Sequence, residues 1–276
     1  MILEKTVELV KQIYRYHKIL PPKINKIIIG HTYSGVEIAT YAYGMILGVA
    51  YTLRDIFKNQ EEDLEGIVED FKEKEQFRDV LKWSYETSNL KRIIGIAALN
   101  AASQHLMTIT NPHKKIKTDL LDYLRIERHS KVICIGLIKP LIQKISRITS
   151  SITIVENKRI PKISPFNKFS IKTNITQLKE NELPTDILIC TGATLINDSL
   201  EEILTYFKRN ARKIVVIGPS ASIIPDILFD WGVDVVGGFK ITDTEAVIKV
   251  IQEGGGTKRF KQFGKKYNLI KEEHII

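Results

Sequence analysis

The sequence predicts an α/β protein of two domains, the second of which holds a mostly parallel sheet. Three observations predict this class. The chain has 276 residues, which at about 100–200 residues per domain suggests two domains. Hydrophobic residues make up 43% of the chain and charged residues 26%, as in globular rather than disordered proteins. From about residue 116 onward, short β-branched runs alternate with helical stretches, a pattern typical of a parallel sheet covered by helices on both faces.

The first half, residues 1–115, mixes helical and extended patterns and predicts an α+β domain. Apolar residues at helical spacing indicate helices, and runs of β-branched residues closed by glycine indicate strands. The predicted elements in chain order are a helix 3–16, a strand 24–29, an extended segment 36–43, a mixed stretch punctuated by Gly44 and Gly48, a charged helix within 58–82, and a buried helix 90–107.

The second half, residues 116–276, predicts a Rossmann-like α/β domain. Its strands are short, continuous and apolar, as expected of strands buried on both faces. The segment 158–182 fits this pattern less well and leaves room for one extra strand, and the basic tail after residues 254–256 is expected to wrap the surface. The predicted strands are 131–136, 152–155, 186–190, 214–217 and 233–236, and the helices are 117–124, 199–209, 223–229 and 244–253.

The net charge of +9 is uneven along the chain. Residues 1–115 carry 16 basic and 14 acidic residues, whereas residues 116–276 carry 25 and 18. A basic half can attract nucleic acid or a small anion. The lysines are scattered rather than clustered, and Ile and Lys are abundant all along the chain, which is typical of a compositionally biased genome and argues against nucleic-acid binding.

Membrane and secretory classes are not indicated. The most apolar run, residues 41–53, is 13 residues long, too short to span a bilayer. The start of the chain is charged and helical, unlike a signal peptide. Two cysteines cannot form a disulfide framework or a four-thiolate metal site, and Cys134 and Cys190 lie in predicted core strands. We therefore expect a cytoplasmic protein.

Ligands of an open parallel sheet bind beyond the carboxyl ends of its strands. After the first predicted strand, Gly136 replaces the glycine triplet of a dinucleotide fold, and Lys139 either meets an anion or points into water. Glu156 ends the second strand, 20 residues after Gly136, where an acidic residue would bind a ribose hydroxyl. The alternative is an ion pair of Glu156 with Lys158 or Arg159.

The loop after the third strand carries two threonines and a glycine. Thr191, Gly192 and Thr194 are expected to form a wall for a small polar or anionic ligand beside a helix N-terminus. Asp198 and Glu201 have the spacing of a capping box at the start of that helix.

The loop 218–220 follows the fourth strand in the same way. We expect Ser220 or Ser222 to cap the next helix, with free N–H groups available to an anion. Gly237 and Gly238 are expected to end the last strand. These glycine-bearing loops follow successive strands, so together they are expected to form one rim of a ligand site.

Several longer segments resemble a known family. They read TGATLINDSLEEIL and VVIGPSASIIPDILFDWGVDVVGG in the second half, and IIIGHTYSGVEIA and SNLKRIIGIAALNAAS in the first. Together they are similar to the uncharacterised family labelled "putative heavy-metal chelation domain". The resemblance implies an enolase N-terminal-like domain over 1–115, a Rossmann-like domain over 116–276, a ligand site in the cleft between them and a role in metal chelation. The positions that it brings to the site are Thr191, Gly192, Thr194, Asn197, Gly218, Pro219, Ser220, Gly237, Gly238, Asn89 and Asn100.

The sequence therefore favours binding of a small anionic or metal-chelating ligand. The cofactor stays open between a divalent metal and a metal chelate, because the six histidines lack metal-binding spacing. Oxygen ligands such as Glu37 and Glu156 are the alternative for a bare ion. A second hypothesis is an enzyme acting on a nucleotide-like or cofactor-like molecule, with Glu156 on a hydroxyl pair. Whether the chain forms a homo-oligomer is left open.

Overall fold

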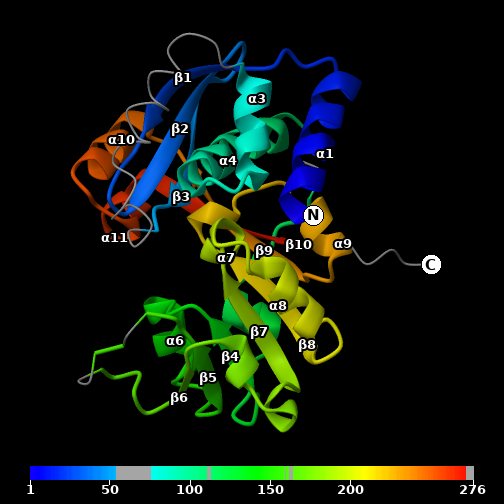
Figure 1. Ribbon diagram of the computed structural model, residues 1–276, viewed down its shortest axis with the longest axis vertical. Helices are drawn as coiled ribbons and strands as arrows, with labels where there is room; N and C mark the ends of the chain where they lie inside the picture. Colours follow the sequence, from blue (N-terminus) through cyan, green and yellow to red (C-terminus); the bar gives the residue numbers. More distant parts are fainter. Residues whose placement is uncertain (54–75, 111–112, 159, 162–163, 272–276) are drawn as a thin grey trace.

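The computed structural model describes residues 1–53, 76–110, 113–158, 160–161 and 164–271, and these residues form a small and a large sheet (Figure 1). The small sheet is antiparallel, in the order β1 (Lys23–Ile28), β2 (Tyr33–Thr40), β3 (Gly44–Tyr51). The large sheet has seven strands in the order β10-β9-β8-β7-β4-β5-β6, parallel from β6 to β9. This confirms the predicted α/β class with a mostly parallel sheet.

The third strand of the small sheet corrects the sequence prediction, which left residues 44–51 as a mixed stretch. Gly48 was interpreted there as punctuation. In the structure it lies inside β3, where a Cβ would be 2.1 Å from the carbonyl oxygen of Ala97 on α4 (Asn89–Thr110). The glycine therefore allows a helix backbone to approach the strand closely.

Helices cover both faces of the small sheet (Figure 1). The predicted first and buried helices are confirmed as α1 (Ile2–Tyr16) and α4, and α4 packs on β2 and β3. On the other face, Gly35 of β2 lies against Ile251 of α10 (Thr244–Gln252). Of the predicted charged helix, residues 58–75 lie outside the described residues, and α3 (Phe77–Lys82) covers its end.

The strands of the large sheet are buried on both faces, which explains their continuous apolar runs. In β4, Ile133 and Ile135 face one hydrophobic cluster, whereas Val132 and Cys134 face another. The elements of this half are α5 (Leu120–Leu124), β4 (Val132–Ile135), α6 (Lys139–Ile145), β5 (Ile152–Val155), β6 (Ser170–Lys172), β7 (Thr185–Thr191), α7 (Ala193–Ile196), α8 (Leu200–Phe207), β8 (Ala211–Ile217), the 3-10 turn η5 (Pro219–Ala221), α9 (Asp226–Asp230), β9 (Val235–Ile241), α10, α11 (Thr257–Phe260) and β10 (Gly264–Ile270).

The end of the chain departs from the prediction. Gly237 and Gly238 lie within β9, not at its end, and the tail forms β10, an antiparallel edge strand, instead of wrapping the surface. The reason is local. A Cβ at Gly238 would be 2.2 Å from the hydroxyl oxygen of Tyr267, so the absent side chain lets this tyrosine lie across β9. The extra strand expected within 158–182 is β6.

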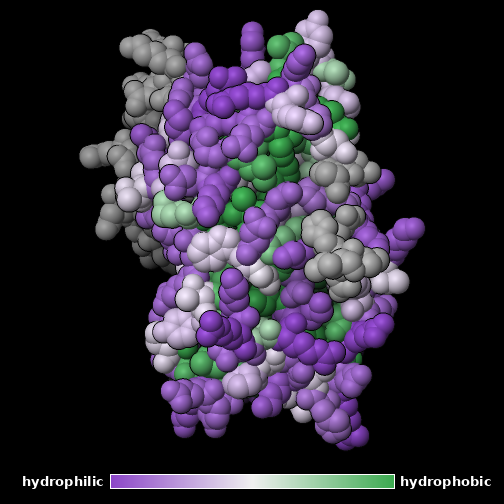
Figure 2. Space-filling model, turned by 90° about the vertical axis from the view of Figure 1, so that its right-hand side faces the viewer, coloured by the Kyte–Doolittle hydropathy of each residue, from purple (hydrophilic) through white to green (hydrophobic). Residues whose placement is uncertain are grey.

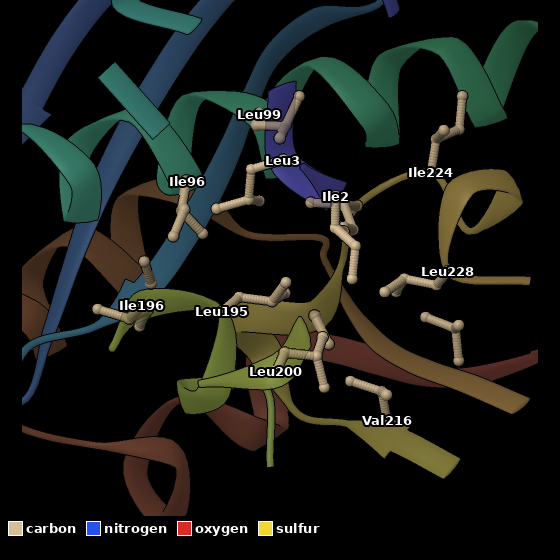
Figure 3. Packing of buried hydrophobic residues seen from close by; sticks show 14 of the residues in the cluster. Ile2, Leu3, Ile96, Leu99, Leu195, Ile196, Leu200, Val216, Ile224 and Leu228 are labelled. Carbon is tan, nitrogen blue, oxygen red and sulfur yellow. The ribbon is translucent and has the colours of Figure 1, made fainter. Parts of the chain in front are cut away.

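The two halves share one hydrophobic cluster. Ile2 and Leu3 of α1 and Ile96 and Leu99 of α4 meet Leu195, Ile196, Leu200, Val216, Ile224 and Leu228 of the large-sheet half (Figure 3). All these side chains are at most 5% exposed. The shared core brings the carboxyl ends of the parallel strands against α4 and β3.

The side of the molecule seen in Figure 2 is polar in large part. On the face shown in Figure 2, hydrophilic side chains dominate and hydrophobic ones appear mainly along a central band. Among the described residues, α4 is long and apolar enough to cross a membrane, but 78% of its apolar window is buried inside the protein. It is the core helix of an α/β fold.

Candidate ligand site at the strand ends

The strand order creates a switch point between β4 and β7. From β4 the chain continues to β5 and β6 on one side, then returns to β7 on the other side. Gly136 follows β4, and Thr191 ends β7. A Cβ at Gly136, whose φ is +94°, would be 2.6 Å from Cγ2 of Thr191. The two loops are therefore in contact at the place where open parallel sheets bind ligands.

Glu156 fastens the neighbouring loop. One carboxylate oxygen accepts a hydrogen bond from the backbone N–H of Leu137 at 2.8 Å, and the other accepts from the N–H of Lys158 at 3.1 Å. The carboxylate thus holds the loop after β4 to the end of β5, a role that neither sequence alternative included. Its contact with a ribose hydroxyl stays a prediction.

The hydroxyls of the loop after β7 support its own turn. Thr194 is buried and donates to the carbonyl oxygen of Thr191 at 2.7 Å. The hydroxyl of Thr191 accepts from the N–H of Ala193 at 3.4 Å. At Gly192 a Cβ would be 2.7 Å from the backbone nitrogen of Ala221, so glycine lets the loops after β7 and β8 touch.

The capping box predicted at the start of the next helix is wrong. Asp198 has a φ of +60° and accepts a hydrogen bond from Arg92 of α4 at 2.8 Å. Glu201 accepts from the backbone N–H of Ile2 instead of an N-cap. Asn197 accepts from the N–H and the hydroxyl of Ser199 and is exposed. The carboxylates of Asp198 and Glu201 therefore bind groups of the first half of the chain and do not cap the helix.

The serines after β8 do not cap α9 either. Ser220 is buried, and its hydroxyl accepts from the backbone N–H of Tyr51 at 2.9 Å, across the two sheets. The hydroxyl of Ser222 accepts from the N–H of Phe239 at 3.0 Å. Both side chains therefore hold the β8 loop against neighbouring strands.

Asn100 joins the same loop to the small sheet. Its fully buried side-chain amide donates to the carbonyl oxygens of Val49 at 2.8 Å and of Pro219 and Ser220 at 3.3 Å each. Its Oδ1 has no hydrogen-bond partner in the described part of the chain. Asn89 begins the same helix eleven residues earlier, about 16 Å away along the axis, and so lies apart from these loops.

The remaining predicted residues lie around this centre. Gly218 donates its N–H to the carbonyl oxygen of Gly237 at 2.9 Å, which places Gly237 beside the β8 loop. Gly238 serves the packing of Tyr267 described above. Lys139 is exposed at the first turn of α6.

One contact at the strand ends was not predicted from the sequence, which offered Lys158 only as an ion-pair partner of Glu156. The ammonium of Lys158 lies 3.5 Å from the hydroxyl of Tyr51 and 5.5 Å from the centre of its ring. No signal in the sequence links them, because Tyr51 ends a strand of the other sheet. Contacts now run from Lys158 and Glu156 to Leu137, along the chain to Gly136, on to Thr191, Gly192 and Ser220, and from there to Tyr51 and back to Lys158. We call this closed series of contacts the strand-end ring.

The cysteines do not form a thiolate site. Both are fully buried, and they face opposite sides of the sheet, because Cys190 pairs with Ile135 and Cys134 with Ile189. Burial raises the pKa of the Cys134 thiol to about 12 and also raises the pKa of Cys190. Metals bind thiolates, so neither thiol is a ligand in its folded environment.

Carboxylates and imidazoles do not gather into a metal site in the part of the chain that the structure describes, where no group of three or more His, Cys, Asp or Glu could hold an ion. Glu37 is buried in β2 and accepts a hydrogen bond from the side chain of Asn25 at 2.5 Å. It belongs to the small sheet, whereas Glu156 is engaged at the end of β5.

Comparison with known proteins gives the same overall fold and no assigned activity. An uncharacterised protein of Methanocaldococcus jannaschii is 23% identical over 223 residues, 81% of each chain. The crystal structure of a DUF364-family protein of unknown function from Pyrococcus horikoshii matches with a TM-score of 0.78 at 20% identity, covering 98% of this chain and all of that one. A second such structure, from Desulfitobacterium hafniense, matches with a TM-score of 0.72 at 18% identity, covering 97% and 100%.

Two family models match the sequence, both described as "Putative heavy-metal chelation". One covers residues 17–103, and the other, DUF364, covers residues 119–270, more than half of the chain. The chain therefore belongs to the DUF364 family.

Proposed function

We propose that the protein binds a small anionic molecule, free or as a metal chelate, at the strand-end ring. The observation that carries the proposal is the position of the Lys158 ammonium beside the hydroxyl of Tyr51, whose backbone N–H is bound to the β8 loop at Ser220. An ammonium and a hydroxyl are donors that recognise carboxylate or phosphate oxygens. The site lies between the proposed domains 1–115 and 116–276.

The family description concerns heavy metals. The hydrogen-bond donors at the strand-end ring favour a metal chelate over a bare metal ion. A bare cation would be repelled by Lys158, whereas the anionic oxygens of a chelate would be attracted. The buried thiols do not offer thiolates to a soft metal. We therefore propose that metal enters this site already bound to a small anionic chelator, in a cytoplasmic protein.

The test is thermal unfolding of the chelator-stripped protein with free divalent metals, with preformed metal–citrate complexes, with citrate alone and with nucleotides. A ligand at about 100 times its Kd adds about 2.7 kcal/mol, which raises the Tm by roughly 5 °C for a chain of this size. We expect the shift with citrate or its metal complexes. A shift with free metal alone would contradict the proposal, and a shift with nucleotides alone would favour the enzyme hypothesis.

Variants locate the response. Lys158→Gln and Tyr51→Phe remove the ammonium and the hydroxyl and should reduce the shift. Lys249→Gln is the matched control, because this exposed lysine of α10 lies on another element and carries the same charge. An equal loss in Lys158→Gln and Lys249→Gln would mean that only net charge attracts the ligand, and it would refute the site.

A further inference from the structure

A second, separate feature is a pocket of about 50 Å³ between the end of α4 and the β9–β10 edge of the large sheet. A water needs about 10–15 Å³ of such space, so the pocket has room for about four oxygen-sized groups. Its lining comes from α4, from residues 113–115 and from β9 and β10: Gln104, Met107, Thr108, His113, Lys115, Lys240, Tyr267 and Leu269.

The charge of this lining is entirely positive. Lys115 and Lys240 line the pocket, and no carboxylate does so among the residues that the structure describes. Lys265 of β10 lies directly opposite Lys240 in the antiparallel register. Like charges placed opposite each other destabilise a sheet, so an anion here would relieve a repulsion that the fold contains.

The two lining lysines are available to an anion. Within the described ranges, neither Lys115 nor Lys240 has a carboxylate oxygen within 4.0 Å. The ammonium of Lys240 donates to the hydroxyl of Thr108 at 3.0 Å, which holds it at the pocket and leaves two of its three protons for other acceptors.

Neutral polar groups complete the lining. Gln104 is buried, and its amide donates to the hydroxyl of Tyr267 at 2.5 Å. Burial raises the pKa of Tyr267, so this hydroxyl stays protonated at neutral pH. The pocket is thus lined by ammonium groups and fixed neutral dipoles.

His113 adds an independent observation. Its side chain is 10% exposed, and its Nε2 lies 2.9 Å from a carboxylate oxygen of Asp226. Its other ring nitrogen, Nδ1, is buried without a hydrogen-bond partner among the residues that the structure describes. A buried polar atom without a partner is costly. Because the Asp226 carboxylate can only accept, Nε2 is the donor and Nδ1 of the neutral ring is an acceptor, so a hydrogen phosphate in the pocket would supply that partner through its own O–H.

We infer that this pocket binds a small oxyanion, the phosphate or carboxylate group of a small molecule, between Lys115 and Lys240. The site is distinct from the strand-end ring, because none of its lining residues belongs to the loops after β4, β5, β7 or β8. The two sites are linked by α4 and by the carbonyl oxygen of Ser222 in the β8 loop, which accepts hydrogen bonds from Gln104 and Tyr267.

The test titrates the full chain with inorganic phosphate and, separately, with acetate at constant ionic strength, and follows the ring resonances of His113 by NMR. Constant ionic strength removes general screening. We expect a saturable change at His113 with at least one anion, and the anion that binds identifies phosphate or carboxylate as the group. Lys240→Gln and Lys115→Gln should each lower the affinity for that anion by about tenfold or more, since each removes a charged donor.

Lys266→Gln is the matched control. Lys266 directly precedes Tyr267 in β10, pairs with Phe239 and therefore points to the face opposite that of Lys265 and Tyr267. The Lys266→Gln variant loses the same charge, and we expect its affinity for the anion to change by less than twofold. Absence of saturable binding of both anions, or equal weakening in Lys240→Gln and Lys266→Gln, would overturn the inference. Lys158→Gln should leave this binding intact, which separates the result from that of the strand-end ring.

Discussion

The backbone N–H of Tyr51 donates to the hydroxyl of Ser220 at 2.9 Å and thereby joins the last residue of β3 to the loop after β8. The bond crosses from the small sheet to the large one. Asn100 makes a parallel connection, because it binds carbonyl oxygens of both Val49 and Ser220. The strand-end ring therefore depends on the position of the small sheet.

Replacing Ser220 with alanine should destabilise the protein by about 1–3 kcal/mol, because the N–H of Tyr51 would lose its partner at a buried position. Urea unfolding measures the effect as a lower midpoint at unchanged slope. Ser150→Ala is the control, since this exposed serine should change stability by no more than about 0.5 kcal/mol. Equal stability of the two variants would show that the bond between the sheets contributes nothing.

Gly48→Ala should be more severe. The new methyl group would be 2.1 Å from the carbonyl oxygen of Ala97 and 2.3 Å from the nitrogen of Ala101, both backbone atoms of α4. Neither can move without displacing the helix, so we expect a loss of about 3 kcal/mol or more. The comparison is Gly35→Ala in β2, where the new Cβ would be nearest to a side-chain carbon of Leu47, at 3.1 Å. Thermal unfolding of both variants decides the point, and a milder effect at Gly48 would contradict the close approach.

His105 should make stability depend on pH. Its Nδ1 lies 2.9 Å from the hydroxyl of Tyr14, and burial lowers its pKa from the ordinary value of about 6.5. The unfolded chain then binds more protons than the folded one below that value, so stability should fall as the pH drops through about 6.5. Urea unfolding between about pH 8 and pH 5 measures the slope.

The matched variants for this slope are His105→Gln, which should flatten it, and His129→Gln, which removes an exposed histidine and should leave it unchanged. A slope that persists in His105→Gln would assign the pH dependence to other groups.

Much of the large sheet follows from the sequence, because strands buried on both faces must be apolar without interruption. That rule locates β4, β5, β7 and β8 correctly. It fails at β10, where Lys265, Lys266 and Tyr267 form an edge strand with one exposed side. Such a strand lacks the continuous apolar run and is indistinguishable from a tail by pattern alone.

The parts of the candidate site that directly follow a predicted strand could be predicted from the sequence. The loops at Gly136 and Thr191 follow from the rule that ligands bind at strand ends. Tyr51 could not be predicted, because its place at these loops depends on how two sheets pack. The same long-range contacts redirected Asp198 from a helix cap to Arg92.

The thiols provide the sharpest test of what kind of metal binding this family member supports. Cys134 and Cys190 are fully buried on opposite faces of the sheet, and burial raises the pKa of both thiols, so both stay protonated at neutral pH. Cys134→Ala and Cys190→Ala should each lose about 1 kcal/mol of stability through a small cavity and yet keep the full thermal shift with a metal chelate. Lys158→Gln should show the opposite result, an unchanged stability with a reduced shift. Rapid reaction of the native thiols with a thiol reagent, or loss of the shift in both cysteine variants, would instead place the metal on sulfur and remove the case for an anionic chelate at the strand-end ring.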